Sequence, residues 1–326
     1  MWASIFTQKK VFFIWQTSKP SRASSKISIA IQNCCRSTRS NSLLKRDCVQ
    51  DWIQLFRPVL CMLAAVAGCI TIYAIDPASS VYQYWLVASV LICTTAAAFA
   101  INDYWDVEKD RLNHPERPLP SGRISRATAK RIASILFSTA LFLALPLGTY
   151  SFLMVMVSTL LLWYYSPLLR YSGILGNVLV ALLVSDLLLF SALVASQLSA
   201  VFYPMFFLFC FTLAKEIVWD VHDIVGDCNS GVVTLASLYG DRTAFRVVWS
   251  LLSLLFLSVP MAVGWLPMRY PAWFVVGSLT LLSSFSVALA RYQSQRSRHT
   301  YTALIFWTRV GLLLSLTGLI GAMPPV

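Results

Sequence analysis

Two groups of three aspartates share one spacing, in which the second residue follows the first by three positions and the third follows by four more. The six residues are Asp103, Asp106, Asp110, Asp220, Asp223 and Asp227. On a helix that turns about 100° per residue, this spacing places three carboxylates within an arc of roughly 60°. Because like charges so close together repel one another, the repeated pattern predicts that each group holds a cation.

Each aspartate group directly follows an apolar run, over residues 84–101 and 202–218. Both groups begin where an apolar run ends, and ionisable groups at membrane depth are costly and usually functional. Carboxylate oxygens suit Mg²⁺, which keeps several waters and also accepts the oxygens of a bound phosphate. We therefore predict that all six aspartates are catalytic metal ligands, and that the two groups form the halves of one site for Mg²⁺ and a diphosphate.

Basic residues lie among and beside the aspartates, where they can bind phosphate oxygens. The predicted diphosphate-binding residues of this kind are Lys109, Arg117, Arg123 and Lys215. The neighbouring stretches are apolar and aromatic, as at Tyr104-Trp105 and Trp163 to Tyr165. A charged mouth above an apolar interior favours an isoprenyl diphosphate as substrate, with aromatic faces available to an allylic carbocation.

The composition predicts that the chain is a membrane protein, whose helices position the charged residues. The chain is 57% hydrophobic and only 12% charged, whereas soluble domains carry about 25% charged residues. We predict an all-α, multi-pass bundle of about nine transmembrane helices. The predicted spans are 58–75, 84–101, 127–145, 149–167, 174–195, 202–219, 243–264, 272–290 and 301–321. With this alternation, both aspartate groups fall on one side of the lipid bilayer, together with nearly all the basic loop residues.

The N-terminal segment differs from the rest of the chain. Residues 1–46 contain nine Lys and Arg and no acidic residue, a composition typical of an organellar transit peptide. We predict a transit peptide or a disordered segment over 1–50 and the transmembrane domain over 51–326, in a plastid or mitochondrial inner membrane. Because much of the net charge of +12 lies in this segment, the basic balance does not indicate nucleic-acid binding.

The motifs and their order resemble a known family. Residues 102–110 and 117–125 resemble the first signature of the UbiA-type intramembrane prenyltransferases, and residues 215–235 resemble the second. Tyr165-Ser166-Pro167 and Gly176-Asn177 resemble the middle elements. The resemblance implies Mg²⁺-dependent transfer of a prenyl group from its diphosphate, and it adds Asn102, Tyr165 and Asn177 to the predicted substrate-binding residues. The motifs are most similar to the homogentisate, geranylgeranylglyceryl phosphate and chlorophyll synthase branches.

Several interpretations remain open at the level of sequence. The leading hypothesis is transfer to an aromatic head group; the alternatives are transfer to a glyceryl phosphate lipid and an acceptor-free membrane terpene cyclase. A transporter is disfavoured, because transporters place charges near the midplane and these acids lie at span ends. Asp186, inside a predicted span, is either a substrate contact or a helix-packing hydrogen bond. His222, beside the second aspartate group, departs from the family pattern.

Overall fold

The computed structural model describes residues 41–169 and 173–325, and the side chains of residues 49–164 and 173–325. The chain divides into two units, Met1–Val49 and Gln50–Val326. The predicted transit peptide falls on the first unit, and residues 1–40 lie outside the described part of the chain. All the predicted site residues belong to the second unit.

The described residues of the second unit form helices joined by short loops. Its long helices are α3 (Pro58–Ile75), α4 (Val81–Trp105), α6 (Arg126–Ala144), α7 (Thr149–Leu169), α8 (Leu175–Val194), α9 (Phe202–Asn229), α11 (Asp241–Trp265), α12 (Pro271–Ser294) and α13 (Arg298–Ala322). The short helices are α5 (Val107–Asn113), α10 (Leu235–Tyr239) and two 3₁₀ turns, Leu145–Leu147 and Leu198–Val201. Helix α2 (Asn41–Phe56) precedes the bundle.

Each predicted span corresponds to one of the long helices, so the predicted all-α membrane fold is confirmed. Where side chains are described, eight helices are long and apolar enough to cross a membrane, and α7 adds the apolar stretch Thr149–Tyr164. Helices α4 and α9 extend past the predicted spans 84–101 and 202–219. These extensions carry Asp103 and the whole second aspartate group out of the apolar layer.

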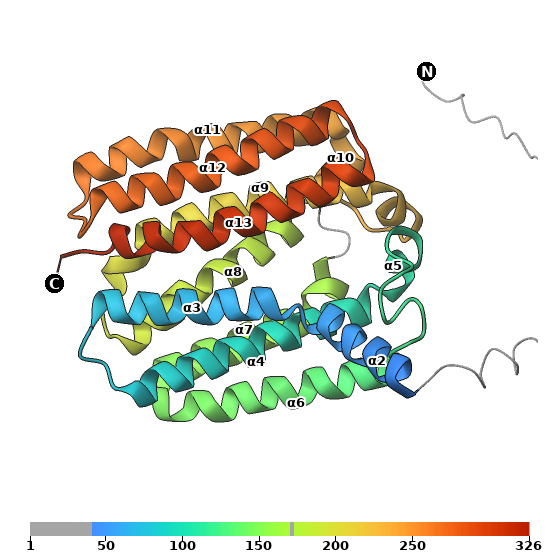
Figure 1. The fold of residues 1–326 in the computed structure, drawn as a ribbon, viewed down its shortest axis with the longest axis horizontal. Helices are drawn as coiled ribbons and strands as arrows, with labels where there is room; N and C mark the ends of the chain where they lie inside the picture. The colour runs from blue at the N-terminus through green and yellow to red at the C-terminus, as the bar shows by residue number, and fades with distance from the viewer. Residues whose placement is uncertain (1–40, 170–172, 326) are drawn as a thin grey trace, which may run out of the picture. The chain divides into compact units, whose positions relative to one another are not determined.

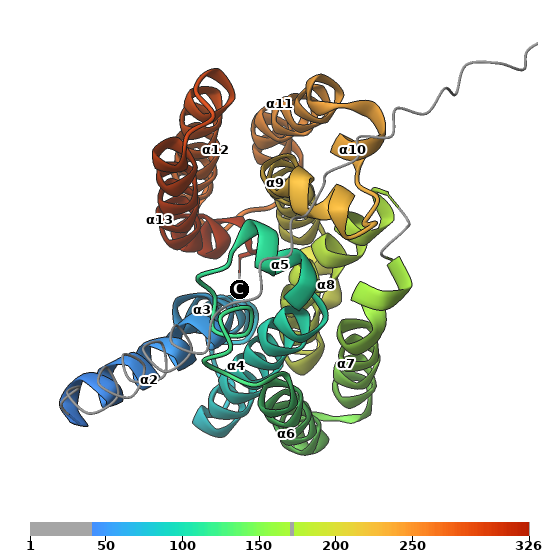
Figure 2. The ribbon, with the colours of Figure 1, turned by 90° about the vertical axis from the view of Figure 1, so that its right-hand side faces the viewer.

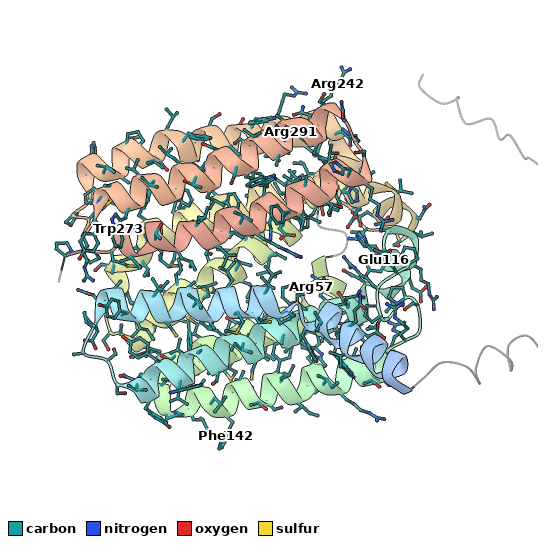
Figure 3. All side chains as sticks on the ribbon, viewed as in Figure 1. Arg57, Glu116, Phe142, Arg242, Trp273 and Arg291 are labelled. Atoms are coloured by element: carbon teal, nitrogen blue, oxygen red, sulfur yellow. The ribbon has the colours of Figure 1, made fainter. Side chains whose placement is uncertain are left out.

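The long helices form a closed arrangement, in which each contacts the next along the chain and α13 contacts α3. Figure 1 shows them side by side, with α5 and α10 at one end of the bundle. In the view along the helices, α5 lies over the centre (Figure 2). Arg242 and Glu116 lie at this α5 end, whereas Trp273 lies at the opposite end (Figure 3). The loops that carry the site therefore cover one mouth of the bundle.

Close backbone approach joins the last two helices. A Cβ added to Gly277 of α12 would lie 2.6 Å from the backbone nitrogen of Gly318 in α13. Small residues allow transmembrane helices to approach closely where no hydrophobic effect drives them together. This contact holds α13 in the place from which it reaches α3 and closes the bundle.

Candidate active site

A cavity of about 770 Å³ lies inside the bundle. It runs from the α5 end, where Asp220 lines it, to Tyr203 near the opposite end of α9. These residues are 17 positions apart, which corresponds to about 25 Å along a helix. The charged and amide side chains at its mouth or just below it are Arg57, Asn102, Asp106, Lys109, Asp110, Arg117, Asn177, Lys215, Glu216, Asp220 and Asp223. Below them the walls are mainly apolar, which gives the charged mouth and apolar interior that the sequence predicts.

The first aspartate group does not lie on one continuous helix, and that part of the prediction is wrong. Helix α4 ends at Trp105 and α5 begins at Val107, with Asp106 between them at φ −92° and ψ 9°. The chain bends here because α5 must turn across the mouth to reach α9. The bend separates the carboxylates: Asp106 and Asp110 line the cavity, whereas Asp103 is 2% exposed and pairs with Arg57 at 2.9 Å.

The second aspartate group lies on the unbroken helix α9, and each of its carboxylates has a different neighbour. Asn177 donates a hydrogen bond of 2.7 Å to Asp220. The Nε2 atom of His114 lies 3.3 Å from Asp223 Oδ1. Lys109 Nζ lies 2.8 Å from Oδ1 of Asp227, which is fully buried. Asp220 and Asp223 line the cavity. Asp227 is not among the lining residues, and it holds Lys109, which lies between Asp106 and Asp110 in the sequence.

Helix α5 joins the two aspartate groups. Lys109 of α5 forms an ion pair with Asp227 of α9. Asn113, also on α5, forms two hydrogen bonds with the backbone of α9. Its Nδ2 donates to the carbonyl of Asp223 at 2.9 Å, and its Oδ1 accepts from the backbone nitrogen of Gly226 at 3.0 Å. The prediction that the groups form two halves of one site therefore has a structural basis in this docking of α5 on α9.

The cations at the mouth keep their charge. Burial alone would lower the pKa of Lys109, but the carboxylates of Asp106 and Asp227 outweigh it and raise that pKa. For Arg117, burial again opposes the charge, and Asp110, 2.7 Å away, together with Asp103 raises the pKa. Both side chains remain cationic and available to a diphosphate.

The carboxylates at the mouth fit Mg²⁺. Among the residues that the structure describes, four aspartate carboxylates line the cavity near its mouth. In that part of the chain, no three acidic, His or Cys side chains converge closely enough to enclose a metal by themselves. This arrangement suits Mg²⁺, which takes one or two carboxylates and completes its octahedron with waters and substrate phosphate oxygens. The residues placed to hold it at the cavity are Asp106, Asp110, Asp220 and Asp223.

The other predicted binding residues divide into three cases. Asn102, Asn177 and Lys215 line the cavity. The side chain of Tyr165 lies outside the described residues. Arg123 is not among the cavity-lining residues; its Nε lies 2.6 Å from Asp51 Oδ1 and its Nη2 donates to the carbonyl of Glu116 at 2.6 Å. These contacts give Arg123 a structural role between α2 and the loop after α5, in place of the predicted diphosphate contact.

Some residues of the site lie outside the sequence motifs and were not predicted. Arg57 stands at the membrane interface in the sequence, yet it lines the cavity and pairs with Asp103 across 46 positions. Asn113 and His114 follow the first motif but contact the second. Gly226 in the second motif is the sequence signal for a contact of this kind. A glycine inside a helix lowers helix stability, so its presence indicates that another group packs closely against it.

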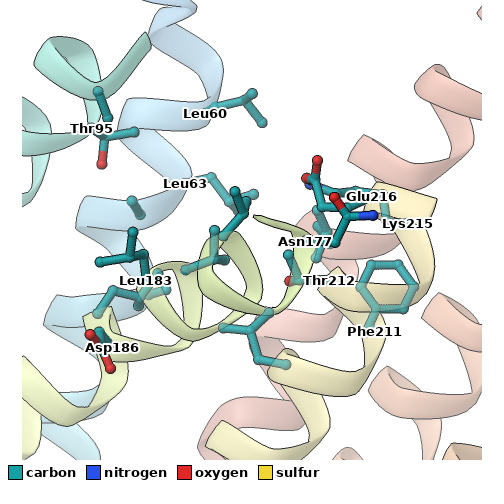
Figure 4. A pocket seen from close by; sticks show the side chains of 18 of the residues that line it. Leu60, Leu63, Thr95, Asn177, Leu183, Asp186, Phe211, Thr212, Lys215 and Glu216 are labelled. Carbon is teal, nitrogen blue, oxygen red and sulfur yellow. The ribbon is translucent and has the colours of Figure 1, made fainter. Parts of the chain in front are cut away.

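Asp186 lines the cavity well below the mouth. Among the described residues it makes no hydrogen bond or ion pair, so the structure gives no support to the helix-packing alternative. Figure 4 shows it near Leu183, at a distance from Asn177 and Lys215. Its carboxylate therefore faces the deeper, apolar part of the cavity.

We expect Gly226→Ala to reduce activity by undocking α5. The new Cβ would lie 2.3 Å from Asn113 Nδ2, so Asn113 must move and release its two hydrogen bonds to α9. A loss of about 1 kcal/mol for each bond is expected. Gly264→Ala is the matched control, because its Cβ would meet nothing within 4 Å. Transfer assays on both variants test this; equal activities would contradict the docking role.

Comparison with known proteins identifies the family of this chain. The chain matches the UbiA prenyltransferase family model over residues 60–310. It is 30% identical over 269 residues to the digeranylgeranylglyceryl phosphate synthase of Pyrococcus abyssi (strain GE5 / Orsay), covering 82% of this chain and 97% of that protein. It is 35% identical over 179 residues to the protein of that name from Sulfolobus acidocaldarius, covering 55% of this chain and 65% of that protein, just under two thirds of its length.

Solved structures share the fold. A UbiA homolog from Aeropyrum pernix K1 has a TM-score of 0.65 at 15% identity, over 78% of this chain and 96% of that one. A UbiA homolog from Archaeoglobus fulgidus bound to GPP and Mg²⁺ has a TM-score of 0.60 at 17% identity, over 82% and 99%. The family model spans most of the helical bundle, and the chain therefore belongs to the UbiA prenyltransferase family, as a multi-pass integral membrane prenyltransferase.

Proposed function

We propose that this enzyme transfers a prenyl group from an isoprenyl diphosphate to the hydroxyl group of a glyceryl phosphate lipid. The observation that carries the proposal is the match to the Pyrococcus abyssi digeranylgeranylglyceryl phosphate synthase over nearly its whole length. This acceptor replaces the aromatic head group as the leading hypothesis. A lipid acceptor also suits a catalytic cavity that lies within the apolar layer of the bundle.

The side chains at the mouth bind the diphosphate. Lys109, Arg117 and Arg57 supply cationic donors to its oxygens, and Asp106 and Asp220 line the same cavity from different parts of the chain. When bound there, Mg²⁺ would draw charge from the leaving diphosphate and stabilise its departure. Because Asp103 and Asp227 hold Arg57 and Lys109 from behind, these cations are positioned before the substrate arrives.

The interior of the cavity holds the prenyl chain and excludes water. Phe207, Phe211 and Phe274 line it together with leucine and alanine side chains. An allylic carbon that loses its diphosphate reacts with any water that reaches it, so a dry wall favours the intended acceptor. The aromatic faces also stabilise developing positive charge.

We expect purified enzyme to prenylate geranylgeranylglyceryl phosphate in the presence of Mg²⁺ and to lose this activity in excess EDTA. The measurement uses radiolabelled geranylgeranyl diphosphate with the lipid acceptor, homogentisate, 4-hydroxybenzoate or no acceptor. Preferential labelling of an aromatic acceptor would contradict the lipid proposal and restore the aromatic hypothesis. A cyclic hydrocarbon formed without acceptor would instead identify a cyclase, and full turnover in EDTA would contradict metal dependence.

The archaeal relatives do not support the organelle localisation predicted from the N-terminal composition. Integral membrane placement rests on the helical bundle and does not depend on that localisation. A fluorescent fusion of residues 1–50 that stays in the cytosol would contradict the transit-peptide prediction.

A further inference from the structure

Two acidic residues in the cavity lie outside the two aspartate groups. Among the residues that the structure describes, the acidic side chains lining the cavity are Asp106, Asp110, Asp186, Glu216, Asp220 and Asp223. Four of them belong to the two aspartate groups. The remaining two, Asp186 and Glu216, lie outside the shared spacing.

Prenyl transfer to a hydroxyl group needs a proton acceptor close to the metal site. The reacting carbon of the donor is bonded to a diphosphate oxygen, so the acceptor oxygen must lie just below the diphosphate. The aspartates at the mouth cannot serve equally well, because Asp220 already accepts from Asn177, Asp110 pairs with Arg117 and Asp223 lies against His114. These carboxylates are also the predicted ligands of Mg²⁺.

Depth in the cavity separates Glu216 from Asp186. Glu216 precedes Asp220 by four residues, so both lie on one face of α9 with Glu216 about 6 Å further from the mouth. Asp186 follows Asn177 by nine residues on α8, which places it about 14 Å further in. Figure 4 shows Glu216 beside Lys215 and Asn177, with Asp186 away from them. With the diphosphate at the mouth, Glu216 is therefore the nearer of the two to the reacting carbon.

Lys215 orients the Glu216 carboxylate. Its Nζ lies 2.7 Å from Glu216 Oε1, and both side chains are 22% exposed, toward the cavity that they line. The ammonium group attracts the carboxylate at this short range and fixes its direction. The ion pair uses Oε1, and no hydrogen bond to Oε2 is found among the described residues.

We propose that Glu216 is the general base that accepts the proton of the acceptor hydroxyl. In this step the bond between the allylic carbon and the diphosphate oxygen breaks, and its electron pair leaves with the diphosphate. The acceptor oxygen forms the new bond to that carbon, and its proton passes to Glu216 Oε2. The proposal rests on the proposed function and deepens it, because it assigns the residue that activates the acceptor. Lys215 acts as a positioning residue.

The test separates ionisation of the donor from capture by the acceptor. We expect Glu216→Gln to lower the kcat of transfer about 100-fold or more, the usual range for a general base. The KM for prenyl diphosphate and its Mg²⁺-dependent, acceptor-independent hydrolysis should stay at wild-type values. Glu216→Asp should recover part of the transfer rate. Formate should restore transfer to Glu216→Ala and not to Asp220→Ala. Thermal unfolding of each full-length variant in detergent establishes that it is folded.

Glu108→Gln is the matched control, because Glu108 is 59% exposed and pairs with Arg111 outside the cavity. Its transfer rate should equal that of the wild type. Near-normal transfer by Glu216→Gln would overturn the proposal, and so would a proportional loss of transfer, hydrolysis and diphosphate binding. If the wild-type enzyme prenylates an aromatic acceptor instead of the lipid, the acceptor assignment fails separately, and the same variants test Glu216 on that acceptor.

Discussion

Replacing Asp106 or Asp220 with alanine is expected to abolish prenyl transfer while the protein stays folded in the membrane. The two carboxylates line the mouth of the cavity from α9 and from the junction of α4 and α5. Each is placed to bind metal on its own side of one diphosphate. Because groups that act as a unit are not additive, the double variant should be little slower than either single one.

Single-turnover transfer by purified variants, with thermal unfolding in parallel, measures this effect. Asp241→Ala is the matched control: Asp241 begins α11 outside the cavity, pairs with Arg296 and is 30% exposed. Its removal should leave transfer unchanged, since exposed ion pairs contribute about 0–1 kcal/mol. Near-normal turnover by either cavity variant would show that the repeated spacing is only solvated charge at helix ends.

Replacing Arg57 with leucine is expected to lower both stability and activity. Arg57 lies 2.9 Å from Asp103, whose side chain is 2% exposed, and Arg117 is the next cation at 4.0 Å. Breaking a buried pair from one side costs about 3–5 kcal/mol. Because Arg117 remains and Arg57 is 26% exposed, we expect about 3 kcal/mol, the lower end of that range.

The cause of the loss of stability in Arg57→Leu can be tested with a second substitution. Asp103→Asn in the Arg57→Leu background removes the uncompensated charge, so the Tm of the double variant should exceed that of Arg57→Leu. The Tm values of the wild type, Arg57→Leu, Asp103→Asn and the double variant, measured by thermal unfolding in one detergent, form the complete cycle. If Arg57→Leu and the double variant have equal Tm values, the ion-pair account is contradicted and a packing role for Arg57 is indicated.

The fold was predictable because apolar runs of membrane length have few alternatives. Residues 58–75 form α3 as predicted, and the other long helices differ mainly at their ends. The ends of α4 and α9 could not be predicted from hydropathy, because their last turns are polar and are stabilised by contacts at the α5 end. The pairing of Lys109 with Asp227 is one such contact, between residues far apart in the sequence.

The site was predictable in its composition but not in the role of each member. The shared spacing treats the three aspartates of a group as equivalent, whereas the structure separates those in the cavity from Asp103 and Asp227, which hold cations behind it. That separation arises from the bend at Asp106 and the docking of Asn113 on α9. Arg123 shows the reverse case, since its position in a motif predicts a binding role and its contacts with Asp51 and Glu116 give a structural one.

The central claim is that the two aspartate groups form one Mg²⁺-dependent diphosphate site. Its most direct test is equilibrium binding of radiolabelled geranylgeranyl diphosphate to the purified full-length protein, with Mg²⁺ titrated from zero, for the wild type, Asp106→Ala and Asp220→Ala. The account predicts tight binding by the wild type only with Mg²⁺, and loss of the Mg²⁺-dependent part in both variants. Binding that is independent of Mg²⁺, or that survives in either variant, would contradict it.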